Sequence, residues 1–233
     1  MFKGFPEETV RFFLDLRLHN ESSFFKAHEQ EYQRYVKEPF YSFIEAMAPA
    51  VSKISEDMEL RPGKCLARIR RDTRFSKDKT PFRDHLWLLF RRSGEPRDNS
   101  VMYWFELSPE NVEWGVGFWG ENRLAMDALR RRITHQPSMV LSALAECGLS
   151  DEERFAFYGD SYQRMKVPEE VPEALRPYYS RKSLYVKRVN VPMTMAYQEG
   201  LVDAVAEDML RLKPMYELFR AAADEGMAQW DAK

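Results

Sequence analysis

The spacing of the apolar residues changes after about residue 57, and this change restricts the chain to folds that combine helices with a sheet. In the first part, residues such as Phe43, Met47 and Val51 recur at the interval of a helix face. Further on, Val112 and Trp114 belong to a run in which every second residue is apolar, which is the period of a strand. The sequence therefore predicts an α+β fold in which N-terminal helices precede a mainly antiparallel sheet packed against helices.

Three helices are predicted in residues 1–57. The first begins at Pro6, where proline suits the first turn, and runs to about His19. Capping residues between Asn20 and Ser23 open the second helix, and Pro39 opens the third. The apolar stripe predicted for the first helix consists of Val10, Phe13, Leu14 and Leu18.

Strands are predicted over residues 65–70, 85–90, 101–107 and 112–118, as a meander of about four strands. In the last of them, Gly115 and Gly117 lie on the face opposite Trp114, which leaves room for another element or a ligand. The remaining elements are predicted as helices over 121–135 and after Pro137, strands over 155–158 and 183–189, and helices from Leu201 and from Pro214 to near Gly226. One domain over 1–233 is expected, with a helical part at 1–57, a sheet and mixed part at 58–199 and C-terminal helices at 200–227.

Composition narrows the class of protein. A chain that is 44% hydrophobic with a net charge of −2 is neither disordered nor basic throughout. Cys65 and Cys147 are far apart in the sequence and have no partner at metal-ligand spacing, so no disulfide framework or zinc site is expected. We also expect no secretory signal and no membrane-spanning segment. These features favour a cytoplasmic protein that does not bind membranes.

The near-neutral total conceals two oppositely charged parts. Between Arg61 and Arg92 there are eleven lysines and arginines but three aspartates, so this segment carries +8 and the remaining chain −10. Closely spaced guanidinium, ammonium and hydroxyl groups suit the recognition of phosphate or carboxylate. The residues expected to bind such an anion are Arg68, Arg70, Arg71, Arg74, Ser76, Lys77, Lys79 and Arg83.

The carboxylates of the same segment allow two interpretations. Asp72, Asp78 and Asp84 orient the arginines through ion pairs, or they act on a ligand as a general base or through a divalent ion. His85 alternates in phase with Trp87 and is expected on the same face as the basic residues. The candidate catalytic residues are therefore Asp72, Asp78 and His85, and no resident metal or cofactor is expected.

Two further groups of residues have a structural and a functional interpretation. The aromatic set could stack nucleic-acid bases or fill the core of the sheet; we favour the core for one face and expect Trp104 and Trp119 to be the exposed members. The triple Arg130-Arg131-Arg132 either forms the solvated side of a helix, which we favour, or extends the basic surface. The whole aromatic set consists of Tyr103, Trp104, Phe105, Trp114, Phe118 and Trp119.

The run from Arg71 to Arg83, RDTRFSKDKTPFR, resembles the signature of the DUF2461 family of uncharacterised bacterial and fungal proteins. The Gly4-Phe5-Pro6 opening, the stretch from Asn20 to Phe25, and Pro39-Phe40 are similar to that family as well. The resemblance implies an α+β protein of one domain and supplies no activity, substrate or cofactor.

Three functions remain open at this point. The basic loop captures a phosphorylated ligand or nucleic acid, it serves an enzyme that acts on phosphate esters, or it is a salt-bridged element that docks a protein partner of unknown identity. The first predicts salt-sensitive binding. The second predicts a pocket with an acid or base beside the cations.

Overall fold

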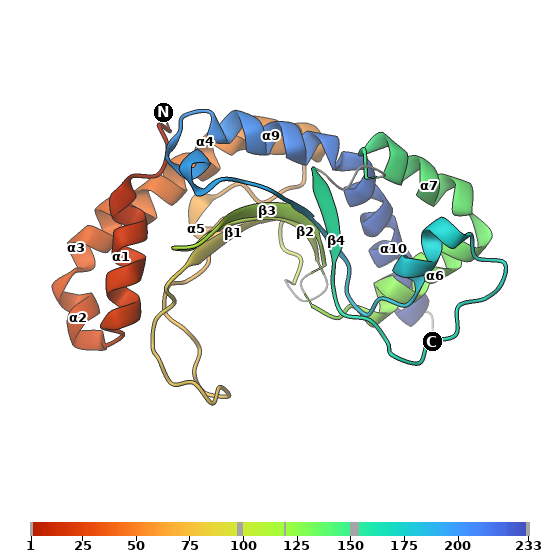
Figure 1. Cartoon of the computed structure of the whole chain (residues 1–233), viewed down its shortest axis with the longest axis horizontal. Helices are drawn as coiled ribbons and strands as arrows, with labels where there is room; N and C mark the ends of the chain where they lie inside the picture. The colour runs from red at the N-terminus through yellow and green to blue at the C-terminus, as the bar shows by residue number, and fades with distance from the viewer. Residues whose placement is uncertain (1, 97–99, 119, 150–153, 232–233) are drawn as a thin grey trace. The chain divides into compact units, whose positions relative to one another are not determined.

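The computed structural model describes residues 2–96, 100–118, 120–149 and 154–231, and it confirms the α+β fold (Figure 1). N-terminal helices precede a five-stranded antiparallel sheet with the strand order β1-β2-β3-β5-β4. Because β5 lies between β3 and β4, the sheet is not a simple meander. The strands are β1 (Leu86–Arg91), β2 (Val101–Leu107), β3 (Val112–Phe118), β4 (Phe155–Tyr158) and β5 (Tyr185–Arg188).

The helices follow the expected order along the chain, and the first lies within one or two residues of its predicted bounds. The N-terminal helical elements are α1 (Glu7–Leu18), α2 (Ser22–Ala27), α3 (Glu29–Glu31), the π-helical turn η1 (Tyr32–Lys37), α4 (Glu38–Ile54) and α5 (Pro62–Cys65). The later ones are α6 (Arg123–His135), α7 (Pro137–Glu146), η3 (Glu173–Leu175), α8 (Arg176–Tyr179), η4 (Met193–Tyr197), α9 (Leu201–Arg211) and α10 (Lys213–Asp231).

Contacts within the chain define two compact units. Unit 1 comprises Met1–Phe90, Trp104–Trp114 and Val191–Glu207. Unit 2 comprises Arg91–Tyr103, Gly115–Asn190 and Asp208–Lys233. The prediction of a single domain over residues 1–233 stays a prediction.

The buried face of helix α1 coincides with the predicted one only at Phe13. Phe12, Phe13 and Leu16 are buried, whereas Leu14 and Leu18 of the predicted stripe are exposed. Burial of Phe12 is explained by its ring contacts, which come from Phe25 and Tyr32 of the following helical elements. The helical period was therefore predicted correctly, but the choice of face depended on aromatic partners elsewhere in unit 1.

The strand predicted over residues 65–70 is wrong. Pro62 instead begins a short helix that ends at Cys65, and the residues after it are extended but form only isolated bridges, of which Leu66 pairs with Leu88. The apolar alternation nevertheless predicts burial correctly, since Ala67 and Ile69 are buried. This extended segment lies beside the start of β1 and forms one arm of the basic loop.

In unit 2, the space left by two glycines of β3 is taken by β5. A Cβ atom on Gly115 would lie 2.0 Å from the carbonyl oxygen of Val186, and one on Gly117 would lie 2.4 Å from Cβ of Tyr185. The two strands pair in antiparallel register, with Gly115 opposite Lys187. The sequence allowed either another element or a ligand to approach these glycines, and the structure shows another element, β5.

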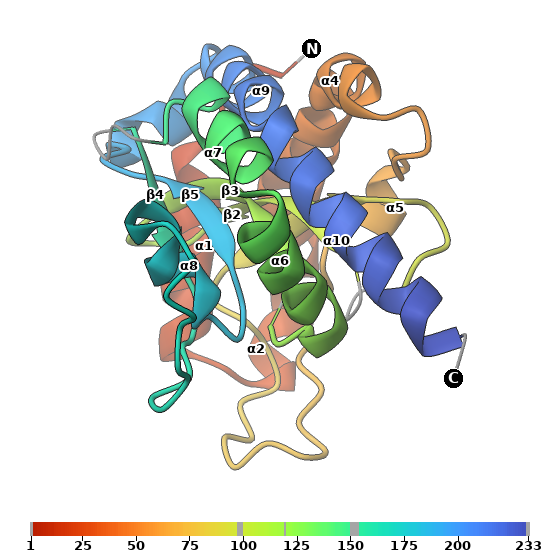
Figure 2. The same cartoon turned by 90° about the vertical axis from the view of Figure 1, so that its right-hand side faces the viewer.

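Helices α6, α7 and α10 pack side by side in unit 2 (Figure 2). Helix α10 does not end near Gly226, as predicted, but continues to Asp231. A Cβ atom on Gly226 would lie 2.6 Å from the carbonyl of Leu124, so this glycine permits a close approach to α6. Its role is therefore helix packing and not helix termination.

Candidate anion-binding cleft

The basic loop of unit 1 projects between two extended arms. Arg70 forms a bridge with Phe82, and the Arg71 N–H donates to the Pro81 carbonyl at 2.8 Å. Residues between them form the long gold-coloured loop that extends away from the rest of this unit (Figure 1 and Figure 2). The basic residues are thus presented on a loop, as the sequence predicts.

Asn20 fixes the outgoing arm of this loop. Its side-chain Nδ2 donates to the Phe82 carbonyl at 3.0 Å, and its Oδ1 accepts from the Phe82 N–H at 2.9 Å. Both backbone polar groups of Phe82 are therefore satisfied by one side chain from the chain segment that follows α1. The Phe82 ring is buried and stacks on Phe25 with a centroid separation of 4.3 Å.

Two of the loop carboxylates pair with arginines of the same loop. Arg74 donates to Asp72 through Nη2 at 2.7 Å and Nε at 3.0 Å, and Arg71 Nη1 donates to Asp78. These hydrogen bonds lower the pKa of each carboxyl to about 2. Asp72 and Asp78 therefore form ion pairs that orient arginines, which is the first of the two interpretations given for the carboxylates of this segment.

Asp84 is the centre of a second set of ion pairs. Arg17 Nε lies 2.5 Å from Asp84 Oδ2, and Arg17 Nη1 lies 2.6 Å from Oε1 of Glu110, in the turn between β2 and β3. On its other side, Asp84 Oδ1 lies 2.9 Å from Nδ1 of His85. Burial raises the pKa of Asp84, but the hydrogen bonds from His85 and Arg17 together outweigh it and the pKa is lowered.

The shift gives Asp84 a defined effect on acid stability. Its ordinary pKa is 3.8, and the folded value is lower, so below 3.8 the unfolded chain takes up the proton first and acid favours unfolding. We expect wild type to be more stable than Asp84→Asn by about 1 kcal/mol near pH 7, and this advantage to be lost progressively as the pH falls below the ordinary pKa of 3.8 and through the lower folded value. Denaturant unfolding of both proteins across this range measures it. A difference independent of pH would contradict the assignment.

These ion pairs surround a cleft of about 370 Å³ in unit 1. Three guanidinium groups, one imidazole and two carboxylates line it, together with amide, hydroxyl and aromatic groups. The lining residues are Arg17, Asn20, Arg71, Asp78, Thr80, Phe82, Arg83, Asp84 and His85.

The indole ring of Trp87 contacts two side chains of the cleft, Arg83 and His85. The Cζ atom of Arg83 lies 4.5 Å from the centroid of the Trp87 ring, and the His85 ring stacks on the same indole at 5.6 Å. Trp87 is itself 5% exposed and so has a fixed position. The sequence predicted this arrangement, because His85 and Trp87 are two residues apart in an alternating run and therefore share a face with a basic residue.

The structure brings together only part of the predicted site. Arg71, Arg83, Asp78 and His85 line the cleft. Arg17 and Asn20 also line the cleft, which they reach from a distant part of the chain, but they were not predicted as site residues. Asn20 nevertheless belongs to the stretch that resembles the DUF2461 family. The predicted residues that do not line it are Arg68, Arg70, Asp72, Arg74, Ser76, Lys77 and Lys79.

The prediction for Arg130-Arg131-Arg132 is wrong. Arg130 is buried in unit 2 and donates to the carbonyls of Tyr179 and Arg181, while Arg131 and Arg132 both pair with Glu225 of α10. The triple is therefore not a solvated helix face, because α10 and the segment around α8 cover it. No local signal in the sequence distinguishes this from an exposed basic helix.

The aromatic set belongs mainly to the core. Tyr103, Phe105, Trp114 and Phe118 are buried, as we favoured for one face, and Trp104 is half-buried. Trp119 lies outside the described residues. These rings offer no open platform for bases in the described part of the sheet.

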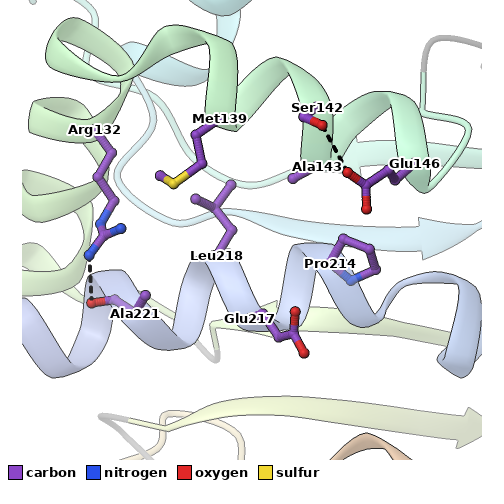
Figure 3. Close-up of a pocket in the computed structure, with 9 residues that line it drawn as sticks. All are labelled: Arg132, Met139, Ser142, Ala143, Glu146, Pro214, Glu217, Leu218 and Ala221. Atoms are coloured by element: carbon purple, nitrogen blue, oxygen red, sulfur yellow. Dashed lines mark hydrogen bonds between the residues drawn. The ribbon is translucent and has the colours of Figure 1, made fainter.

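A groove in unit 2 provides a comparison with the cleft. It lies among α6, α7 and α10, and the close-up in Figure 3 shows Met139 and Leu218 near its centre. Arg132 is the one cation among its lining residues, and it already donates to the Ala221 carbonyl and pairs with Glu225. The groove is thus mainly apolar and contains none of the predicted site residues.

The model of the DUF2461 family, described as a conserved hypothetical protein, matches residues 8–218. The chain belongs to the DUF2461 family. The match spans the whole basic loop and every residue of the cleft. Among curated proteins, no match to this chain was found. Because the DUF2461 description names no activity, any function has to be argued from the cleft itself.

Three negative observations apply to the described part of this DUF2461 chain. None of its helices there is both long and apolar enough to cross a membrane. No cluster of three or more His, Cys, Asp or Glu side chains suited to a metal ion occurs among the described residues. Both cysteines are buried thiols and not halves of a disulfide. The cytoplasmic location stays a prediction.

Proposed function

We propose that the cleft of unit 1 binds a phosphate-bearing anion. The observation that supports this proposal is the convergence of Arg17, Arg71 and Arg83 on one cleft, with His85 beside them. Guanidinium groups present paired N–H donors whose geometry matches phosphate oxygens. The cleft contains one more guanidinium than carboxylate, so it favours a negatively charged ligand over a neutral one.

Two of the ion pairs around the cleft are open to displacement by such an anion. The Asp78 side chain, which pairs with Arg71, is 55% exposed, and the Glu110 side chain, which pairs with Arg17, is 54% exposed. Pairs this exposed contribute less than about 1 kcal/mol each. A phosphate with two negative charges can therefore displace these single carboxylates and take over their arginines.

Substitution of the arginines tests the proposal. Each of Arg71→Met and Arg83→Met removes a charged donor from the cleft while keeping an unbranched side chain. We expect each to weaken the binding of inorganic pyrophosphate about tenfold, since one charge-assisted hydrogen bond contributes about 1.5 kcal/mol. Calorimetric titration of the full chain at fixed salt concentration measures the change.

Arg68→Met is the matched control, because Arg68 is an exposed cation of the same basic segment that does not line the cleft. It is expected to bind pyrophosphate within twofold of wild type. Equal losses in all three variants would show that the segment attracts anions only through its total charge. Absence of binding by wild type would refute the proposal.

A second function is favoured by the contact between His85 and Asp84. When Nδ1 carries a proton and donates it to Asp84 Oδ1, Nε2 of His85 is left as a base in the cleft. In hydrolysis of a phosphate ester, Nε2 would take a proton from the attacking water while the water oxygen bonds to phosphorus and the P–O ester bond breaks. The departing alkoxide would then take up a proton, from Nε2 or from solvent. Turnover of a phosphomonoester by wild type that is lost in His85→Gln, with pyrophosphate binding retained, would support an enzyme.

A further inference from the structure

Phe75 at the tip of the basic loop has no structural role that the fold explains. Its side chain is 94% exposed, more than any other large hydrophobic residue described in the chain. The guanidinium of Arg74 lies over its ring, with Cζ 5.7 Å from the ring centroid. Much of the ring is therefore open to solvent, where an apolar group gains nothing for folding.

Hydrogen bonds hold the loop backbone around Phe75. Lys79 Nζ donates to the Thr73 carbonyl at 2.8 Å, and the Ser76 N–H donates to the same carbonyl at 3.3 Å. Together with the ion pair between Arg74 and Asp72, these bonds fix the backbone on both sides of Phe75. A ring presented on a constrained loop loses little conformational entropy when it meets a partner.

The surroundings of the ring are positively charged. Arg74, Lys77 and Lys79 are exposed, and the two aspartates of the loop are engaged by Arg74 and Arg71. Residues 71–80 carry four cations against two carboxylates. A partner suited to this tip is anionic and also offers a flat apolar face.

We propose that Phe75 stacks on a base of single-stranded nucleic acid, whose phosphates are contacted by the flanking cations. This inference goes beyond the proposed function, because it names a class of ligand for the loop tip, which is not among the residues that line the cleft. Single strands combine stackable bases with regularly spaced phosphates, and an aromatic ring beside cations is the arrangement that binds them. The base would cover the open part of the ring.

A lipid surface fits the loop less well. The side chains of Asp72 and Asp78 are 58% and 55% exposed, so insertion of Phe75 would bring both carboxylates toward an anionic bilayer. A bound single strand can avoid this contact, because its phosphates turn toward the cations while the base lies on the ring. The charge distribution thus favours nucleic acid over a membrane.

Fluorescence anisotropy of the full chain with a labelled oligothymidylate tests the inference. Phe75→Ala is expected to weaken binding about 5- to 150-fold, the range of one stacked base, and Phe75→Trp to retain it. Trp230→Ala, which removes a 63% exposed aromatic ring from α10, is the matched control and should bind as wild type does. A duplex of the same length should bind more weakly than the single strand.

The outcomes separate this inference from the proposed function. If Phe75→Ala binds the oligonucleotide as tightly as wild type while pyrophosphate still binds the cleft, the stacking proposal is wrong and the anion site stands. If pyrophosphate fails to bind but oligonucleotide binding depends on Phe75, the cleft proposal is wrong and stacking stands. Phe75-dependent binding to phosphatidylserine vesicles, without binding to the oligonucleotide, would overturn stacking in favour of a membrane contact.

Discussion

Replacement of Phe5 by alanine is expected to lower the free energy of unfolding by about 3–5 kcal/mol, the usual cost of removing a large aromatic ring from a packed core. Phe5 is 2% exposed. Its ring centroid lies 4.8 Å from that of Phe40 and 5.7 Å from that of Phe105, so truncation leaves a cavity between α4 and β2. Denaturant unfolding followed by circular dichroism measures the loss.

The backbone around Phe5 limits how far this cavity can collapse. The Phe5 N–H donates to the Ala196 carbonyl at 2.9 Å, and the preceding Gly4 has φ of +101°. A Cβ atom on Gly4 would lie 2.3 Å from the Tyr197 carbonyl oxygen, so the chain passes tightly against η4. Because the backbone is fixed here, most of the cavity should persist and the cost should lie in the upper half of the range.

Phe75→Ala provides the matched control, because the same atoms are removed from a ring that is 94% exposed. Its effect on the free energy of unfolding should be within about 0.5 kcal/mol, as for other surface positions. A loss at Phe75 comparable to that at Phe5 would contradict the description of the loop tip. A small effect on stability combined with a large effect on oligonucleotide binding would assign Phe75 to recognition.

The period of the apolar residues allowed most of the elements to be predicted, since period depends on local chain geometry. Strand β2 and strand β4 lie where the alternation places them. Pairing is not local, and the segment after Cys65 shows the consequence: its side chains alternate between core and solvent, yet its backbone forms only isolated bridges. The alternation of apolar residues therefore predicts which side chains are buried more directly than it predicts which strands pair through hydrogen bonds.

The candidate site could be predicted only where its residues are close together in the sequence. Arg71, Arg83 and His85 belong to one charged segment and were identified there. Arg17 enters the cleft because α1 packs near the outgoing arm of the loop, and Asn20 because its amide matches both polar groups of Phe82. Neither contact leaves a pattern in the composition or spacing of the chain.

Arg130 provides the last test, and a large effect is expected because its guanidinium is buried. The residue is 8% exposed, and its Nε and Nη2 donate to the carbonyls of Tyr179 at 2.8 Å and Arg181 at 2.5 Å. Methionine has a similar length but no donor, so Arg130→Met would leave both carbonyls without this partner. We expect a loss of about 2–4 kcal/mol in the free energy of unfolding.

Arg131→Met distinguishes burial from charge, because it removes an identical charge from the adjacent position. The Arg131 side chain is 38% exposed, and its partner Glu225 keeps an ion pair with Arg132 at 3.0 Å when Arg131 is lost. The cost of this substitution should therefore stay below about 1 kcal/mol. Equal losses at both positions in denaturant unfolding would show that Arg130 acts through its charge alone. A larger loss at Arg130 would show that its buried guanidinium holds the segment around α8 against α6. The sequence alone predicts instead that the three arginines form a solvated surface.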